Sequence, residues 1–201
     1  PHSPPLSTHH PLLRLTSMFE IKSKQQSAMI SSNFSQLMVN LNWTSAIDFD
    51  LFAVYETKAG KLGIVYYGDM GDLNRSPFML LSEDEGVGDQ GGDNQESLII
   101  SSLSEMRYVW VCAWDYNAVT QSRRGRFDDS DLNMTVIDDQ GEYKIPLVDQ
   151  SSGNTALVLT IDNTSPVLSR LVNSSEVITL HGLNPDELIK FLKGTLSSLQ
   201  A

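Results

Sequence analysis

The residues best suited to chemistry lie in one glycine-rich acidic segment, EDEGVGDQGGDNQE, which runs from Glu83 to Glu96. Packing many carboxylates together costs electrostatic repulsion unless a cation or solvent relieves it. Glycines allow tight backbone turns, and oxygen ligands on a flexible loop suit Ca²⁺ better than Mg²⁺, which requires a rigid octahedron. A solvated acidic loop without a ligand is the alternative that this segment alone leaves open. Its carboxylates, with no basic residue among them, are Glu83, Asp84, Glu85, Asp89, Asp93 and Glu96.

Three further acidic positions extend this pattern. Asp48 and Asp50 lie two residues apart in the sequence IDFDLF, and residues two apart in a strand point to the same side. They form either part of a metal site or an exposed pair on an edge strand. Asp115 ends the most hydrophobic segment of the chain, where it either reaches the metal cluster or caps a loop.

Other site chemistries fit the sequence less well. The acidic segment lacks the ligand spacing of an EF-hand and the lysine of a P-loop. Outside the first residues the only histidine is His181, so neither a histidine-rich zinc site nor a serine–histidine triad is predicted. The single cysteine, Cys112, lies inside an apolar segment and is interpreted as a buried hydrophobic residue.

Charge and composition narrow the class of protein. A formal net charge of −11 opposes binding to nucleic acid or to anionic membrane surfaces. No apolar stretch reaches the roughly 18 residues that a membrane span needs. One cysteine and no visible secretion signal predict a cytoplasmic protein. The proline- and histidine-rich residues 1–17 are interpreted as a flexible leader that need not be native, and residues 18–201 as a single domain.

Alternating and short apolar segments predict an all-β fold, an antiparallel β-sandwich with one short C-terminal helix. The segment YVWVCAW at 108–114 is apolar on both faces and predicts a central strand. Asp138–Gly141 predicts a hairpin turn in which glycine adopts a positive φ. Asn184 and Pro185 mark the start of the helix, and Gly194 its end. Strands are expected at 37–43, 49–55, 62–67, 78–81, 98–103, 108–114, 132–137, 143–148, 156–161, 167–172 and 177–180.

The order of several motifs resembles the TerD-type family of tellurium-resistance and stress proteins. The resemblance covers about residues 37–136, and the later stretch TIDNTSPVLSRLVNSS looks more like the TerA-type branch. It implies a β-sandwich that binds calcium ions at one end through acidic loops, with a role in resistance to tellurite and other stresses. The motifs are Leu41-Asn42-Trp43, Asp48-Phe49-Asp50-Leu51, the loop Gly88–Glu96, Trp114-Asp115 and Arg124-Gly125-Arg126-Phe127.

The resemblance carries over unevenly to individual residues. Thr44 stands where the family often has aspartate, Asn94 replaces an aspartate of the loop, and Asp128 replaces the glycine after Phe127. Asn94 still offers a carbonyl oxygen, but it lowers the ligand charge. Acidic positions of the family pattern are matched by Asp48, Asp50, Asp89, Asp93 and Glu96. The resemblance and the residues together predict Ca²⁺ ligands at Asp48, Asp50, Asp89, Asp93, Asn94, Glu96 and Asp115.

The function predicted from sequence is therefore a non-enzymatic calcium-binding module that acts with a partner protein of a stress-response complex. A calcium-dependent carbohydrate- or phospholipid-binding module is an alternative from a different class. A hydrolase that uses paired carboxylates is a third hypothesis. The sequence disfavours the hydrolase because no aromatic platform for a sugar is evident beside the acidic loop.

Overall fold

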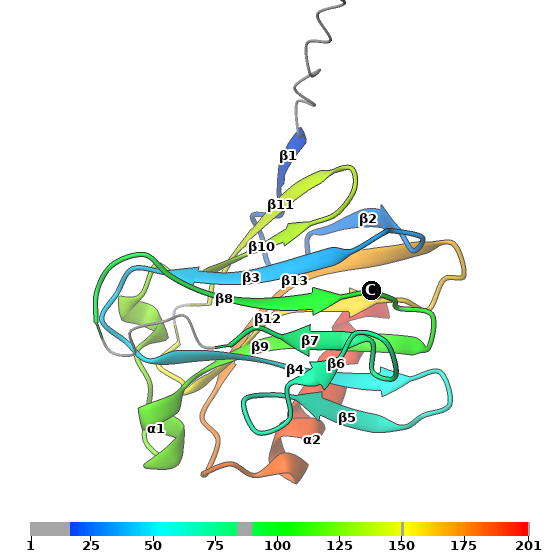
Figure 1. Ribbon diagram of the computed structural model, residues 1–201. Coiled ribbons are helices and arrows are strands. Elements are labelled where there is room, and N and C mark those ends of the chain that lie inside the picture. Colours follow the sequence, from blue (N-terminus) through cyan, green and yellow to red (C-terminus); the bar gives the residue numbers. More distant parts are fainter. Residues whose placement is uncertain (1–16, 84–89, 150, 201) are drawn as a thin grey trace, which may run out of the picture.

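The computed structural model describes residues 17–83, 90–149 and 151–200. Two β-sheets pack face to face with a hydrophobic core between them, and a C-terminal helix covers the outer face of one sheet (Figure 1). The predicted mostly-β sandwich is thus confirmed. None of the helices in the described parts of the chain is long and apolar enough to cross a membrane.

Sheet A has seven strands in the order β1-β11-β10-β3-β8-β7-β6. All of its neighbouring strands are antiparallel except β1 and β11, which pair in parallel. The strands are β1 (Ser17–Glu20), β3 (Leu37–Trp43), β6 (Gly71–Asp72), β7 (Met79–Leu81), β8 (Asn94–Ile100), β10 (Asn133–Ile137) and β11 (Gly141–Pro146).

Sheet B has six antiparallel strands in the order β2-β13-β12-β9-β4-β5. The strands are β2 (Ser27–Ser31), β4 (Phe49–Thr57), β5 (Leu62–Val65), β9 (Met106–Asp115), β12 (Thr155–Asp162) and β13 (Leu168–Ile178). Two helices, α1 (Tyr116–Thr120) and α2 (Pro185–Thr195), and two 3-10 turns, Phe127–Asp129 and Leu196–Gln200, complete the described elements.

Strand β9 is the central, two-sided strand that its composition predicted. Val109, Val111 and Ala113 face the core between the sheets, while Trp110 and Cys112 face a second core beneath α2. Both sets are fully buried. The uninterrupted apolar sequence therefore reflects two different contacts, one with sheet A and one with the helix.

Helix α2 begins as predicted but ends later. Asn184 is the N-cap, and its side-chain oxygen accepts a hydrogen bond from the Glu187 N–H. Leu188 and Leu192 are the buried residues of its apolar face. The prediction that Gly194 ends the helix is wrong, because Gly194 lies inside α2 and a 3-10 turn follows Thr195. Gly194 does not have the positive φ of a glycine that terminates a helix.

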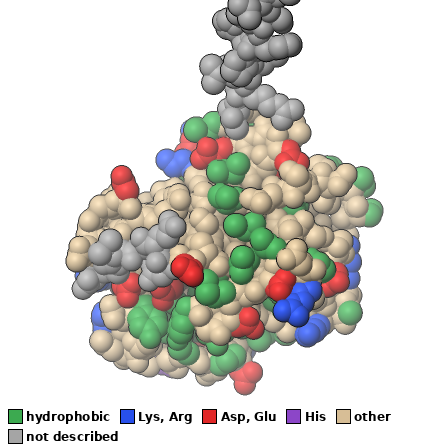
Figure 2. Space-filling view, in the orientation of Figure 1, with side chains coloured by type: hydrophobic (Ala, Val, Ile, Leu, Met, Phe, Trp, Pro, Cys, Tyr) green, Lys and Arg blue, Asp and Glu red, His purple; other side chains and the backbone are tan. Residues whose placement is uncertain are grey.

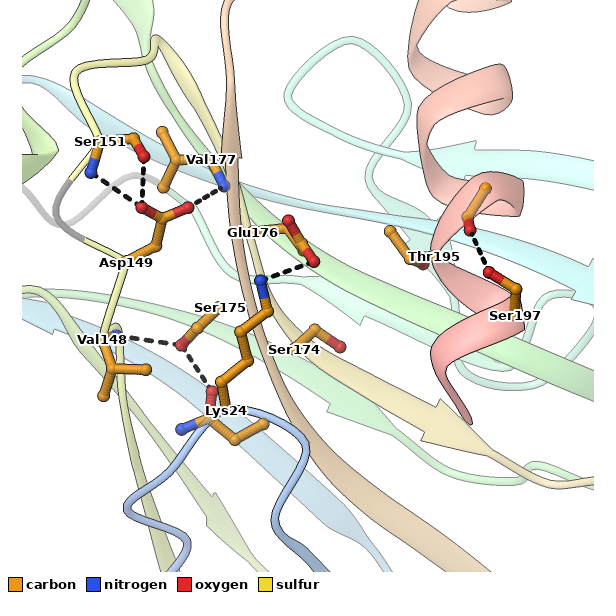
Figure 3. Close-up of polar contacts among 12 residues, drawn as sticks. Lys24, Val148, Asp149, Ser151, Ser174, Ser175, Glu176, Val177, Thr195 and Ser197 are labelled. Carbon is orange, nitrogen blue, oxygen red and sulfur yellow. Dashed lines mark hydrogen bonds and ion pairs between the residues drawn. The ribbon is translucent and has the colours of Figure 1, made fainter. Parts of the chain in front are cut away.

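The prediction of two strands at 167–172 and 177–180 was also wrong, because one strand, β13, runs through the polar sequence NSSE between them. A β-bulge there gives Ser175 a positive φ of 42°. The side chain of Asn173 donates to the carbonyls of Ile21 and Pro146 (2.9 and 3.0 Å), and Val148 N–H donates to Ser175 Oγ at 3.0 Å. Figure 3 shows the Val148 contact beside the salt bridge between Lys24 and Glu176. Buried and partly buried hydrogen bonds to other segments thus stabilise a polar stretch within the strand.

The hairpin between β10 and β11 is confirmed, but the predicted role of its glycine is wrong. Gly141 does not have a positive φ. It lies against the backbone of β1, where an added Cβ would collide with the carbonyl oxygen of Ser17. Close approach of a strand that is distant in sequence, rather than turn geometry, requires glycine here.

Candidate functional site

Strand β8 begins four residues earlier than the sequence predicted, and this changes the setting of two candidate ligands. Asn94 and Glu96 belong to β8 and not to the preceding loop, where they pair with Trp43 and Leu41 of β3. Both side chains are buried, each with a relative exposure of 6%. The period-two pattern of the strand places Glu96 on the inner face of sheet A beside apolar neighbours.

Glu96 joins the two sheets. Its Oε2 accepts a hydrogen bond of 2.6 Å from the backbone N–H of Leu51 in β4. Strand β5 pairs with β4 only over Ala53–Glu56, so none of the described strands pairs with this part of the β4 edge on that side. The carboxylate therefore supplies the acceptor that a further strand would otherwise provide, and such charge-assisted bonds are short and strong.

Asp48 immediately precedes β4, Asp50 is the second residue of that strand, and both line the same pocket as Glu96. Asp50 is opposite Trp114 of β9, and its Oδ2 accepts a 3.1 Å hydrogen bond from the Trp114 indole N–H. The carbonyl of Asp48 accepts from Tyr116 N–H at 3.0 Å. These contacts fix the end of β4 against the end of β9, and they place both aspartates beside the same opening.

We call this opening the acidic pocket. It has a volume of about 420 Å³ and is lined by Asp48, Asp50, Leu51, Tyr67, Met70, Leu81, Ser82, Glu83, Glu96 and Tyr116. Four carboxylates from both sheets thus converge, and no described lining residue is basic. At the lower left of Figure 2, acidic side chains gather at one end of the sandwich with hydrophobic side chains beside them.

The other predicted ligands are elsewhere or outside the described residues. Asp93 is exposed in the turn before β8 and does not line the acidic pocket. The Asn94 amide donates to the carbonyls of Gln90 and Gly92, at 3.2 and 3.3 Å, and so stabilises that turn. Asp89 lies outside the described residues.

Asp115 is fully buried and does not line the acidic pocket. Its Oδ1 accepts from Ala118 N–H at 3.2 Å, which makes it the N-cap of α1. Its Oδ2 lies 4.0 Å from Arg126 Nε. Of the two roles that the sequence left open for Asp115, the structure shows the capping one.

The described carboxylates do not form a compact metal site in this conformation. No group of three or more histidine, cysteine, aspartate or glutamate side chains is close enough to hold a metal ion among residues 17–83, 90–149 and 151–200.

Two tyrosines that no sequence motif marks border the carboxylates. Tyr67 and Tyr116 both line the acidic pocket, and their rings meet edge to face with centroids 6.0 Å apart. Partial burial raises the pKa of the Tyr67 phenol, and the neighbouring Tyr116 and Asp50 shift it in the same direction. The sequence signal was weak, because Tyr67 follows β5 and Tyr116 follows β9 with no shared spacing. Aromatic rings therefore do lie beside the acidic residues, although no sequence pattern predicts this.

Thr44, which stands where the resembled family often has aspartate, is held by Asp131. The Thr44 N–H and hydroxyl donate to the two Asp131 oxygens at 2.8 and 2.6 Å. Burial disfavours the Asp131 carboxylate, but these hydrogen bonds outweigh that effect and lower its pKa. Asp131 belongs to the segment just before β10, the strand that pairs with β3, and its hydrogen bonds anchor the end of β3.

No family model matches this chain, and no curated protein is detectably similar to it.

Proposed function

We propose that this protein is a calcium-binding β-sandwich and that Ca²⁺ binds in the acidic pocket. One observation carries the proposal: Asp48, Asp50 and Glu96, predicted as ligands from sequence, converge with Glu83 on one pocket from both sheets. Hard carboxylate oxygens without a basic neighbour suit Ca²⁺, which accepts roughly six to eight oxygen ligands in variable geometry.

The chemistry of these side chains fits the ion even though they do not surround a common point. A carboxylate has about four lone-pair sites, so a carboxylate that accepts a hydrogen bond, as Glu96 and Asp50 do, can also ligate a cation. A divalent cation replaces repulsion among the carboxylates with attraction and draws them together. Asp89, which lies outside the described residues, stays a predicted further ligand.

Membership of the TerD-type family, with its role in tellurium resistance and stress response, is part of the same proposal. The two-sheet sandwich and the Asp-x-Asp pair at one end of it support this assignment. A cytoplasmic location is consistent with the single, buried cysteine. We propose a non-enzymatic role in which the calcium-bound end of the sandwich contacts a protein partner.

Calorimetric titration of the chelator-treated protein with Ca²⁺ tests the proposal, with Mg²⁺ as the competing ion. We expect saturable, calcium-selective heat and a rise in melting temperature, since a ligand that binds only the folded state stabilises it. The double variant Asp48→Asn/Asp50→Asn should lose both effects.

The matched control is Glu105→Gln, which removes one exposed charge at the opposite end of β4, where the Glu105 carbonyl accepts from Lys58 N–H. This control should titrate like the unmodified protein. Absence of calcium binding at millimolar concentration would reject the proposal, and equal loss in the control would show a general charge effect in place of a site.

A calcium-dependent carbohydrate-binding function is the second candidate. The observation that favours it is the pair of rings, Tyr67 and Tyr116, on the border of the acidic pocket. Sugar faces stack on such rings while calcium binds vicinal hydroxyls. A glycan array probed with and without calcium tests it, and Tyr67→Ala should remove any calcium-dependent signal.

A further inference from the structure

A second pocket adjoins the acidic one and is almost entirely apolar. It has a volume of about 450 Å³ and lies between the outer face of sheet B and the start of α2. Val54 and Trp114 line it from the sheet, Ile64 from β5, and Leu183 and Leu188 from the helix side. We call it the apolar pocket. Its volume falls within the roughly 300–1,000 Å³ typical of small-molecule sites.

Tyr67 connects the two pockets, because it lines both of them. Trp114 provides a second connection, since its ring lines the apolar pocket while its indole N–H donates to Asp50 of the acidic pocket. A molecule whose body fills the apolar pocket therefore meets carboxylates at this end.

The charges around this pair of pockets favour a cation. None of the described residues that line either pocket is lysine, arginine or histidine, whereas four are acidic. The positive end of α2 does not reverse this sign, because its first turn carries Asp186 and Glu187 and its N-cap is occupied by Asn184. Aromatic rings such as Tyr67 add attraction for an organic cation through their faces.

We propose that the apolar pocket binds a small amphiphilic cation, with its hydrocarbon body against Val54, Ile64 and Leu188 and its ammonium group beside Tyr67 and Asp50. Burial of the hydrocarbon supplies affinity, and the carboxylates select the charge of the head group. This inference does not depend on calcium binding. Because Asp50 serves both, Ca²⁺ and the amphiphilic cation compete where both bind.

Octylammonium is the probe, and octanoate, of equal chain length and opposite charge, is its matched control. Each is titrated into the full chain in chelator-containing buffer, followed by calorimetry and by the fluorescence of tryptophan. We expect saturable binding of octylammonium with a change in tryptophan emission, since Trp114 lines the pocket. Octanoate should show no saturable binding.

Variants separate the two halves of the site. Asp50→Asn keeps an acceptor for the Trp114 indole and removes the charge, so it should weaken octylammonium binding about tenfold. Leu183→Ser should weaken octylammonium binding through lost apolar contact with the probe. The Leu183 side chain is 47% exposed, so this substitution should leave the fold intact. Glu105→Gln, remote from both pockets, should bind octylammonium as the unmodified protein does.

Equal or tighter binding of octanoate would overturn the charge assignment, and no binding of either probe would overturn the site. Octylammonium binding that Asp50→Asn and Leu183→Ser both leave unchanged would also overturn it, because the probe would then lie elsewhere. A protein that binds octylammonium but gives no heat with Ca²⁺ would retain this inference while rejecting the proposed calcium function.

Discussion

The hydrogen bond between Glu96 and Leu51 makes a quantitative prediction about how the sandwich is held closed. Replacing Glu96 with alanine leaves the Leu51 N–H of β4 without its carboxylate acceptor, at a part of the edge that β5 does not reach. A buried donor left unsatisfied costs about 1–3 kcal/mol, and loss of a charge-assisted bond lies at the upper end. We therefore expect Glu96→Ala to lower the free energy of unfolding by about 2–3 kcal/mol.

Glu96→Gln separates the hydrogen bond from the charge. Glutamine retains an acceptor oxygen, and neutral hydrogen bonds are about half as strong as charge-assisted ones, so we expect a loss of about 1 kcal/mol. Gln95→Ala is the control, since Gln95 is the exposed neighbour that donates to Asn42 on the other face of the sheet.

Urea unfolding in chelator-containing buffer, followed by circular dichroism, measures these differences without a contribution from calcium. In thermal unfolding, a loss of 2–3 kcal/mol corresponds to a decrease in melting temperature of about 4–12 °C for a chain of this length. If Glu96→Ala matches Gln95→Ala in stability, the bond does not close the edge. If Glu96→Gln is as destabilised as Glu96→Ala, the charge and not the hydrogen bond is responsible.

Three further predictions concern stability away from the candidate site. Leu192→Ala, in the fully buried contact between α2 and sheet B, should cost about 2–5 kcal/mol in urea unfolding, whereas Leu192→Met should cost less than about 1.5 kcal/mol. Asn184→Ala should cost about 1 kcal/mol through loss of the α2 N-cap, and Asn184→Ser should restore most of it. Burial disfavours the Asp149 carboxylate, but hydrogen bonds from Ser151 and Val177 outweigh this effect and lower its pKa. The ionised carboxylate therefore stabilises the folded state above the unfolded-state pKa, and this stabilisation is lost as pH falls through the folded-state pKa. Acid unfolding should therefore show Asp149→Asn less stable than the unmodified protein near neutral pH, with the gap closing below about pH 4.

Local patterns predicted much of the fold because they report burial directly. The alternation in Leu37–Trp43 gave β3 its observed bounds, since each inward residue must be apolar to enter the core. The two-sided segment at 108–114 predicted a central strand, and Asn184-Pro185 predicted the start of α2, because capping chemistry involves only neighbouring residues.

Predictions from local sequence were wrong where contacts with a segment distant in sequence decided the local conformation. The polar sequence at 173–176 predicts a break between strands, but hydrogen bonds with residues 21, 146 and 148 stabilise it within β13. Gly141 predicts a turn conformation, but the approach of β1 is what requires it. Short exposed strands such as β1 and β2 gave too little apolar pattern to be predicted.

For the candidate site, too, some features could be predicted from the sequence and others depended on the tertiary structure. The sequence by itself determined that the protein carries an excess of carboxylates and that Asp48 and Asp50 lie two residues apart, and from these it predicted a calcium site. Only the tertiary structure brought Glu96 from sheet A to the edge of β4 in sheet B, set Tyr67 and Tyr116 beside the aspartates, and turned Asp115 to cap α1. The physical reason is that a pocket depends on which strand ends meet across the two sheets, and strand pairing over long sequence separations is a property of the whole chain.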